Sequence, residues 1–274
     1  MILVPIIATV GLGSLGLAWI LRRRFPADLD ISSHVEEIQA KRPDLLFQIE
    51  RKLPEEDRAK LKQAFHPSPD FRWVMVGGET FDESNETLMS KYDELNSYLL
   101  ECMVQFIERY GYVLVCRDAT TLEYLGSVAY LPPYPSNWLF YSHFVRTVIP
   151  MGQPPAYQWK DPVLKARFDS METMWNMQKE VFELKGRRDH VYVANVGVAP
   201  AAQGKGVGKL MMQVVQQLAD GQPLLLECLD KNVAFYQKCG YERALQYELQ
   251  AKGEPTTLPY NTMYCNAAVD VQSD

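Results

Sequence analysis

The pattern of apolar and polar positions changes abruptly in the second half of the chain. Residues 191–198 are a run of mostly β-branched and aromatic residues, which is typical of a strand. Pro200 has no N–H to donate and therefore ends the ladder. From Val207 onward, apolar residues recur at the 3.6-residue spacing of an amphipathic helix, at positions 207, 210, 211, 214, 215 and 218. We therefore expect a strand, a turn and a helix in direct succession.

The rest of the chain continues this alternation of periods. Further strand patterns occur at residues 112–117, 122–131, 223–228 and 257–265. Helical spacing covers residues 53–65, 85–110, 138–148, 166–184 and 230–239. Strands that alternate with helices after an initial hairpin predict an α/β (α+β) fold, with one central mixed sheet flanked by helices.

The N-terminus has a different pattern, because residues 1–21 carry no charge and three arginines follow directly. As a helix this segment would be about 31 Å long, enough to cross the hydrocarbon core of a bilayer. A cleavable signal carries its positive charge before the apolar region, so an uncleaved transmembrane helix is the expectation. The positive-inside rule then predicts a single-pass membrane protein with a cytosolic catalytic domain. Residues 22–50 are assigned to a basic juxtamembrane linker with a short helix, and residues 51–270 to the folded domain.

Composition narrows the classes of partner. The formal net charge is −6 and no basic stripe accompanies aromatic residues, so a nucleic-acid partner is not expected. The five cysteines are scattered and never spaced as C-x-x-C, and the four histidines form no ligand pattern. Neither a disulfide framework nor a metal site is therefore predicted, and a reducing compartment is favoured.

The turn before the helix is the strongest chemical signal, and it reads Gln203, Gly204, Lys205, Gly206, Val207 and Gly208. A helix N-terminus presents unpaired N–H groups and the positive end of the helix dipole, which suits a phosphate. Glycines let the backbone approach an anion closely, and Lys205 adds a positive charge. The spacing matches neither a P-loop nor a dinucleotide fingerprint. A G-x-G-x-x-G run at residues 11–16 is not followed by the second strand that a dinucleotide fold requires.

This turn resembles the Gln/Arg-x-x-Gly-x-Gly/Ala pyrophosphate loop of the GNAT superfamily, the acetyl-CoA-dependent N-acetyltransferases. Residues 232–241 are similar to the second signature of that family, shortened by two positions between Asn232 and Tyr236. The resemblance covers roughly residues 55–266 and is nearest in pattern to puromycin-type small-molecule acetyltransferases. It implies the GNAT fold, in which the middle strands of the sheet splay apart.

The resemblance also implies roles for individual residues. The strand residues whose backbone would hold the pantetheine are Val196, Gly197 and Val198. Residues 203–208 would hold the pyrophosphate, and Asn232 would bond a backbone or pantetheine amide, or cap its helix. Tyr236 would protonate the departing coenzyme A thiolate, because a phenol with an ordinary pKa of about 10 stays protonated at neutral pH.

A carboxylate inside an apolar strand suggests the remaining role. Glu227 lies in the run 223–228, where an unpaired charge is costly to bury. We interpret it as a base acting through water or as an anchor for a substrate ammonium, with an ion pair to a Lys or Arg as the alternative. His190, at the start of the central strand, is a second candidate for the base.

Together these features predict an acyltransferase that moves acetyl from acetyl-CoA to a primary amine of a small molecule, by direct attack in a ternary complex. No metal is expected as cofactor. Acetylation of a protein lysine or N-terminus is an alternative, which an open groove would favour. A catalytically silent CoA-binding module held at a membrane is another, although Tyr236 and the intact loop argue against it.

Overall fold

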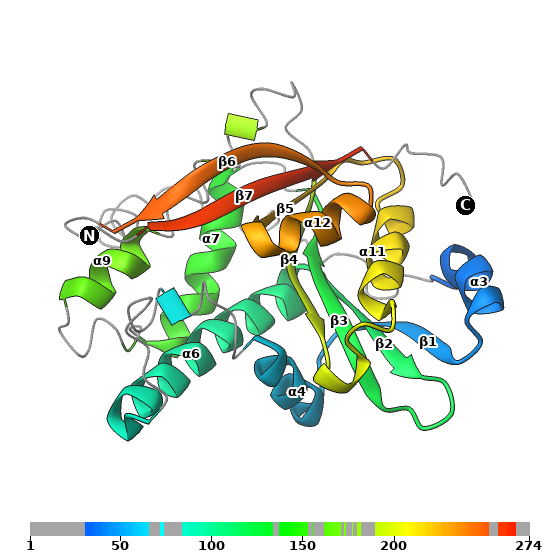
Figure 1. Cartoon of the computed structure of the whole chain (residues 1–274), viewed down its shortest axis with the longest axis horizontal. Helices are drawn as coiled ribbons and strands as arrows, with labels where there is room; N and C mark the ends of the chain where they lie inside the picture. Colours follow the sequence, from blue (N-terminus) through cyan, green and yellow to red (C-terminus); the bar gives the residue numbers. More distant parts are fainter. Residues whose placement is uncertain are drawn as a thin grey trace, which may run out of the picture.

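A computed structural model gives the architecture of the chain (Figure 1). It describes residues 31–65, 72–73, 84–133, 137–152, 155, 162–170, 173, 177, 180–181, 190–251 and 257–266.

Seven strands form one sheet in the spatial order β1-β2-β3-β4-β5-β7-β6. Their bounds are β1 Leu45–Glu50, β2 Tyr112–Asp118, β3 Tyr124–Leu131, β4 Val191–Val198, β5 Leu224–Leu229, β6 Glu242–Gln250 and β7 Thr257–Cys265. Neighbouring strands are antiparallel except β4 and β5, which are parallel. The predicted mixed α/β sheet is confirmed.

Helices pack on both faces of this sheet (Figure 1). Their bounds are α3 Ser32–Lys41, α4 Glu55–Phe65, α6 Glu86–Tyr110, α7 Asn137–Val148, α9 Pro162–Ser170, α11 Val207–Leu218 and α12 Asp230–Lys238, with short 3-10 turns at η2 Ile149–Met151 and η3 Pro200–Ala202. A methyl group added at Gly197 of β4 would meet Leu61 of α4 at 2.5 Å, which places α4 on one face. Gly208 of α11 packs against Val198 and against Phe235 of α12, so α11 and α12 share the other face.

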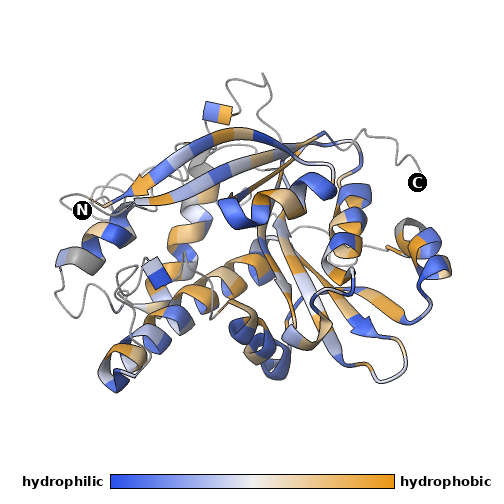
Figure 2. Ribbon diagram, in the orientation of Figure 1, coloured by the Kyte–Doolittle hydropathy of each residue, from blue (hydrophilic) through white to orange (hydrophobic). Residues whose placement is uncertain are grey.

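The main core lies in the middle of the sheet. The central strands carry fully buried side chains such as Leu114, Val128 and Leu224, and Met211 of α11 covers them. Hydrophilic residues gather on α4, on the outer sides of the helices and along β6 (Figure 2). This division of apolar and polar residues is what the helical and strand periods of the sequence require.

Two strands of the sheet were not expected from the sequence. Residues 45–50, assigned above to the juxtamembrane linker, form the edge strand β1, which pairs with β2. Residues 242–250 form β6 at the opposite edge, where it pairs with β7. β6 is largely exposed and rich in Glu and Gln, so its strand character comes from pairing with β7 and not from an apolar pattern.

The fold prediction is wrong in one respect, because it included a transmembrane helix. In the part of the chain that the structure describes, no helix is both long and apolar enough to span a bilayer. The longest of these helices, α6, carries charged residues such as Lys91 and Glu101 along its length. The segment proposed as the anchor, residues 1–21, lies outside the described residues.

Candidate functional site

The two middle strands separate soon after they meet. β4 pairs with β5 only through Val191 with Leu224 and Tyr192 with Leu225, although both strands continue further. On its other side β4 stays paired with β3 as far as Val198. In the described structure, residues 193–198 therefore have no strand on the β5 side, and this open edge is suited to an extended ligand that binds as an added strand.

A β-bulge lies at the point where the strands separate. Ala129 of β3 faces Asn195, and the next residue, Tyr130, faces Val193, so Ala194 is the extra residue. A bulge reverses the alternation of side chains along its strand. Tyr192, before the bulge, is consequently on the same face as Asn195 and Gly197, which is the face that α4 covers.

The glycine-rich loop follows directly from the end of β4. Gln203 donates a hydrogen bond from Nε2 to the carbonyl oxygen of Val198 at 3.1 Å, which ties the loop to the strand. Gly204 and Gly206 have φ of +77° and +80°, values at which a side chain would be strained. Among the described residues, no atom lies within 4 Å of where a Cβ would stand at either glycine, so this side of the loop is open in the described structure.

This loop leads into α11 without a capping side chain. Gly206 is the N-cap of α11, and no side chain at that position bonds the N–H groups of the first turn. Those donors have no carbonyl partner within the helix, and the helix dipole makes them an attractive site for an anion. The loop residues predicted to bind a pyrophosphate are thus arranged around one group of donors, with Lys205 exposed beside them.

Tyr236 lies on α12, which begins directly after β5. Its side chain is only 9% exposed, and its ring packs between Phe235 and Tyr241, with ring centroids 5.0 and 5.9 Å away. Asn232 is half-buried in the first turn of the same helix. The N-cap of α12 is Leu229, so the interpretation of Asn232 as a simple N-cap is wrong.

Glu227 is half-buried in β5 and accepts a hydrogen bond of 2.7 Å from the hydroxyl of Tyr192 to Oε2. Burial, and after it the charge of Glu227, raises the pKa of a second phenol, Tyr247. The sequence suggested an ion pair with Lys or Arg as the alternative role, whereas the structure shows a tyrosine as hydrogen-bond donor to Glu227.

The two predicted catalytic side chains come from opposite faces of the sheet. Glu227 shares the face of Tyr192, which α4 covers, because Tyr192 is paired with Leu225 two residues before Glu227. Tyr236 is on α12, which lies beside α11 on the other face. His190 precedes β4, at the end of the strand away from the glycine loop.

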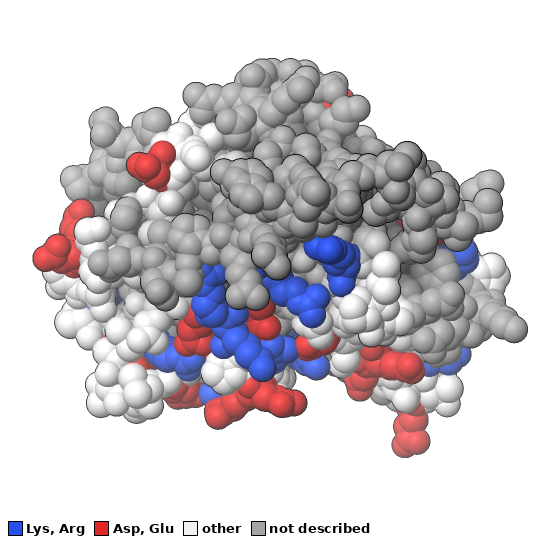
Figure 3. All heavy atoms as spheres, turned by 180° about the vertical axis from the view of Figure 1, so that it is seen from behind, with Lys and Arg blue, Asp and Glu red and all other residues white. Residues whose placement is uncertain are grey.

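The surface seen from behind mixes both signs of charge. Lys and Arg side chains gather near its middle with Asp and Glu among them (Figure 3). On the described part of this face, such a mixture of signs differs from the basic stripe of a nucleic-acid-binding protein.

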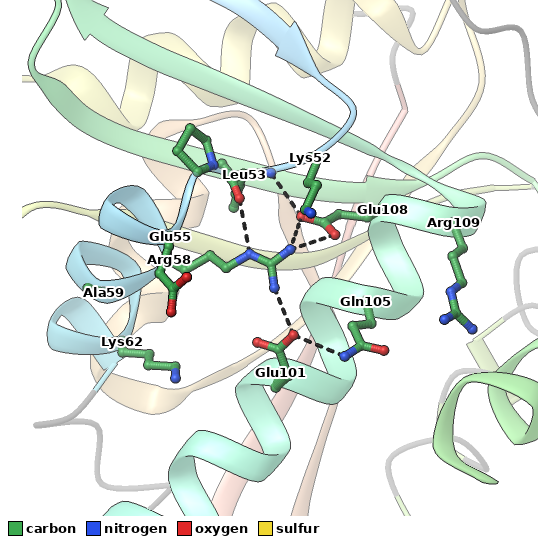
Figure 4. A pocket seen from close by; sticks show the side chains of 11 residues that line it. Lys52, Leu53, Glu55, Arg58, Ala59, Lys62, Glu101, Gln105, Glu108 and Arg109 are labelled. Carbon is green, nitrogen blue, oxygen red and sulfur yellow. Dashed lines mark hydrogen bonds and ion pairs between the residues drawn. The ribbon is translucent and has the colours of Figure 1, made fainter. Parts of the chain in front are cut away.

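A polar hollow of about 850 Å³ lies between α4 and α6. Arg58 lies at its centre and bonds both Glu101 and Glu108 at 2.7 Å (Figure 4). Arg58 also donates from Nε to the carbonyl oxygen of Leu53. These bonds fix α4 against α6 and so brace the helix that packs on Gly197.

Tyr192 and Asn195 lie on the same face of the sheet as Glu227 but were not singled out from the sequence. The pattern of residues 191–198 suggests simple alternation, which would put Tyr192 and Asn195 on opposite faces. The bulge at Ala194 places them on one face. A polar Asn in the middle of an apolar strand was the available signal.

Residues 176–243 match the family model of the acetyltransferase (GNAT) domain. This range includes the glycine loop and Tyr236, so the match supports the predicted resemblance to a GNAT acetyltransferase domain over this part of the chain. The matched range covers β4, α11, β5 and α12 completely.

Several known acetyltransferases match the chain in part. The glucosamine 6-phosphate N-acetyltransferase of Schizosaccharomyces pombe is 39% identical over 64 residues, which are 22% of this chain. The match spans 58% of that relative's length. The structure of a histone acetyltransferase HPA2 and related acetyltransferase from Corynebacterium glutamicum has a TM-score of 0.47 and 16% identity, covering 82% of this chain and 98% of that one. Drosophila melanogaster polyamine N-acetyltransferase has a TM-score of 0.46 and 12% identity, covering 81% and 100%.

Proposed function

We propose that the chain is an N-acetyltransferase that moves the acetyl group of acetyl-CoA to a primary amine of a small molecule. The observation that carries this function is the open edge of β4, which leads directly into an uncapped, glycine-rich helix start. One part suits the amide-containing arm of coenzyme A, and the next suits its pyrophosphate. Few other ligands combine an extended amide chain with a diphosphate at one end.

The residues present fit such a ligand. The backbone of Val196, Gly197 and Val198 supplies groups for the pantetheine, and one N–H there polarises the thioester carbonyl. The N–H groups of residues 203–208 and the first turn of α11 bind the pyrophosphate, with open space beside Gly204 and Gly206. Asn232, in the first turn of α12, is placed to bond a pantetheine amide.

Transfer to a protonated amine removes two protons from the nitrogen, the first before attack and the second, to water, as the tetrahedral intermediate collapses, while one proton must reach the sulfur. Glu227 accepts the first ammonium proton through water or holds the ammonium in place, and the hydroxyl of Tyr192 orients its carboxylate. The amine nitrogen attacks the thioester carbon, and the C–S bond breaks as the tetrahedral intermediate collapses. Tyr236 donates its phenolic proton to the thiolate on the opposite face of the sheet.

The similarity to glucosamine 6-phosphate N-acetyltransferase supports a small primary amine as acceptor. The family match covers the glycine loop and Tyr236, so the cofactor half of the site is the better supported part. Membership of a puromycin-type branch stays a prediction.

The test uses the full chain and a panel of small primary amines, with release of free thiol from acetyl-CoA as the readout. We expect acetyl-CoA alone to raise the melting temperature, and at least one amine to release thiol and appear as its N-acetyl product. Acetylation of a lysine peptide but of none of the amines would assign a protein acceptor. Absence of a thermal shift with acetyl-CoA would refute the coenzyme assignment.

A further inference from the structure

A buried side-chain amide lies beside the splayed strands. Asn195 is only 6% exposed, and within the described part of the chain its Oδ1 has no hydrogen-bond partner. Leaving a buried acceptor unsatisfied costs about 1–3 kcal/mol, and folded proteins contain few such groups. An apolar residue of the same size would remove this cost, so the amide is retained at the expense of stability.

The strand register places this oxygen opposite Glu227. Tyr192 pairs with Leu131 of β3 and Asn195 pairs with Ala129, two residues away on β3, because the bulge residue Ala194 has no partner there. Asn195 is therefore two paired positions beyond Tyr192. Glu227 lies two positions beyond Leu225, the partner of Tyr192 on β5. Asn195 and Glu227 are therefore at the same level on the same face, on the two sides of the opening between the strands.

We infer that Asn195 is an acceptor-binding residue, whose Oδ1 takes a hydrogen bond from the same amine that Glu227 engages. This inference rests on the proposed function. A protonated primary amine has three N–H groups and no acceptor, so two oxygens on opposite sides of the opening suit it. When Glu227 draws off or holds one proton, the bond to Asn195 fixes the nitrogen and aims its lone pair at the thioester.

The arrangement also selects among amines. After one proton has left, a primary amine still has an N–H for Asn195 and a second that is lost during acyl transfer. An N-methylated amine has only one N–H left, and its methyl group competes for the space beside the amide. The site should therefore prefer primary amines to their N-methyl analogues, because the analogue leaves Asn195 unsatisfied.

The experiment compares the full chain with Asn195→Leu and, as a matched control, Ser127→Ala. Ser127 is a buried polar residue on β3 that bonds Tyr124 at 2.8 Å, so its role is structural. We expect Asn195→Leu to raise KM for the amine roughly tenfold to a hundredfold, with KM for acetyl-CoA unchanged and a melting temperature equal or higher. Ser127→Ala should lower the melting temperature and leave both KM values unchanged. The preference for a primary amine over its N-methyl analogue should shrink only in Asn195→Leu.

The outcomes separate this inference from the function on which it rests. If the unaltered chain acetylates an amine and Asn195→Leu keeps its KM and its selectivity, Asn195 has no part in acceptor binding. A marked loss of melting temperature in Asn195→Leu would assign the amide a structural role and also overturn the inference. If the unaltered chain acetylates no amine, the proposed function fails and takes this inference with it.

Discussion

Gly206, before α11, and Gly221, after it, both need a positive φ, but only Gly206 lies at the proposed binding loop. Comparing substitutions at the two positions therefore distinguishes an effect on stability from an effect on binding. Gly206 and Gly221 have φ of +80° and +76°, and in the described part of the chain no atom lies within 4 Å of where a Cβ would stand at either position. Alanine at either position costs roughly 1–2 kcal/mol because L-residues are strained there. Gly206, however, is the N-cap of α11, whereas Gly221 follows the end of that helix.

We expect Gly206→Ala and Gly221→Ala to lose similar amounts of stability, measured by urea unfolding without ligand. Only Gly206→Ala should also weaken acetyl-CoA binding, because its methyl group enters the open space next to the first-turn donors. Titration with acetyl-CoA by calorimetry checks this difference. Equal affinities in the two variants would place the coenzyme away from the loop.

Tyr236→Phe tests the proton donor. Its ring packs between two aromatic neighbours, and phenylalanine preserves that packing. We expect kcat to fall roughly a hundredfold or more, which is the usual contribution of a general acid, while KM for acetyl-CoA stays near its original value. Tyr241→Phe is the control, since Tyr241 is a buried neighbour on the same side. Undiminished kcat in Tyr236→Phe would assign the proton to another group.

The sequence identifies individual residues with unusual chemistry, but not a residue whose position depends on a β-bulge. Glu227 stands out because it is charged within an apolar strand, and Tyr236 because it occupies a family motif. Their catalytic roles remain predictions. Asn195 gains its position from a bulge, and a bulge depends on pairing with β3, which residue periodicity does not encode.

Among the elements, α4 is held from two sides and meets the central strand where the thioester is expected. Arg58 and its partners Glu101 and Glu108 join α4 to α6, and Asp57 pairs with Arg117 of β2. On its inner side Leu61 covers Gly197, where a Cβ would come within 2.5 Å of Leu61 Cδ1. The close approach of α4 to β4 therefore depends on a glycine in the strand.

Gly197→Ala should lower the free energy of unfolding by about 1–3 kcal/mol, because the methyl group forces α4 outward. Leu61→Ala in the same chain should restore part of that loss by vacating the contested space. A double-mutant cycle measured by denaturant unfolding gives the coupling between the two positions. If the two substitutions change the free energy of unfolding additively, the contact between Leu61 and position 197 does not set the spacing of α4 from β4.

The contact between α6 and α7 makes the stability of the folded chain depend on pH. His143 of α7 stacks on Tyr110 of α6 with ring centroids 3.9 Å apart. Burial, with a smaller effect of Arg146, lowers the pKa of His143 from 6.5 to about 4. The unfolded chain therefore binds a proton that the folded chain resists, and stability should fall as pH decreases from about 6.5 towards 4.

We expect His143→Phe, which preserves the stacked ring, to reduce the loss of stability at acid pH. Urea midpoints at pH 7 and pH 5 provide the measurement, and Arg146→Gln serves as a control that should reduce the loss less. The difference between the two pH values should be smaller in His143→Phe than in the unaltered chain. An identical difference would place the acid sensitivity elsewhere.

Elements with a strong period were predicted to within a few residues, and those that depend on neighbours were not. Residues 191–198 and the helix from Val207 agree with β4 and α11, because apolar period and glycine signals coincide there. β1 is short and β6 is largely polar, so only their positions beside β2 and β7 make them strands. α9 begins at Pro162, before the predicted start at residue 166, since proline is favoured in a first helical turn.

For the whole molecule, the single parallel pairing divides the sheet into two parts. β1 to β4 form one antiparallel set, and β5, β7 and β6 form another. Only two residue pairs, at Val191 and Tyr192, join the sets by strand pairing. A ligand that lies along the open edge of β4 would replace the missing pairs and act as a removable strand. Under the proposed function, binding of the coenzyme would join the two sets of strands, so the two sets are least firmly attached to each other when the open edge is empty.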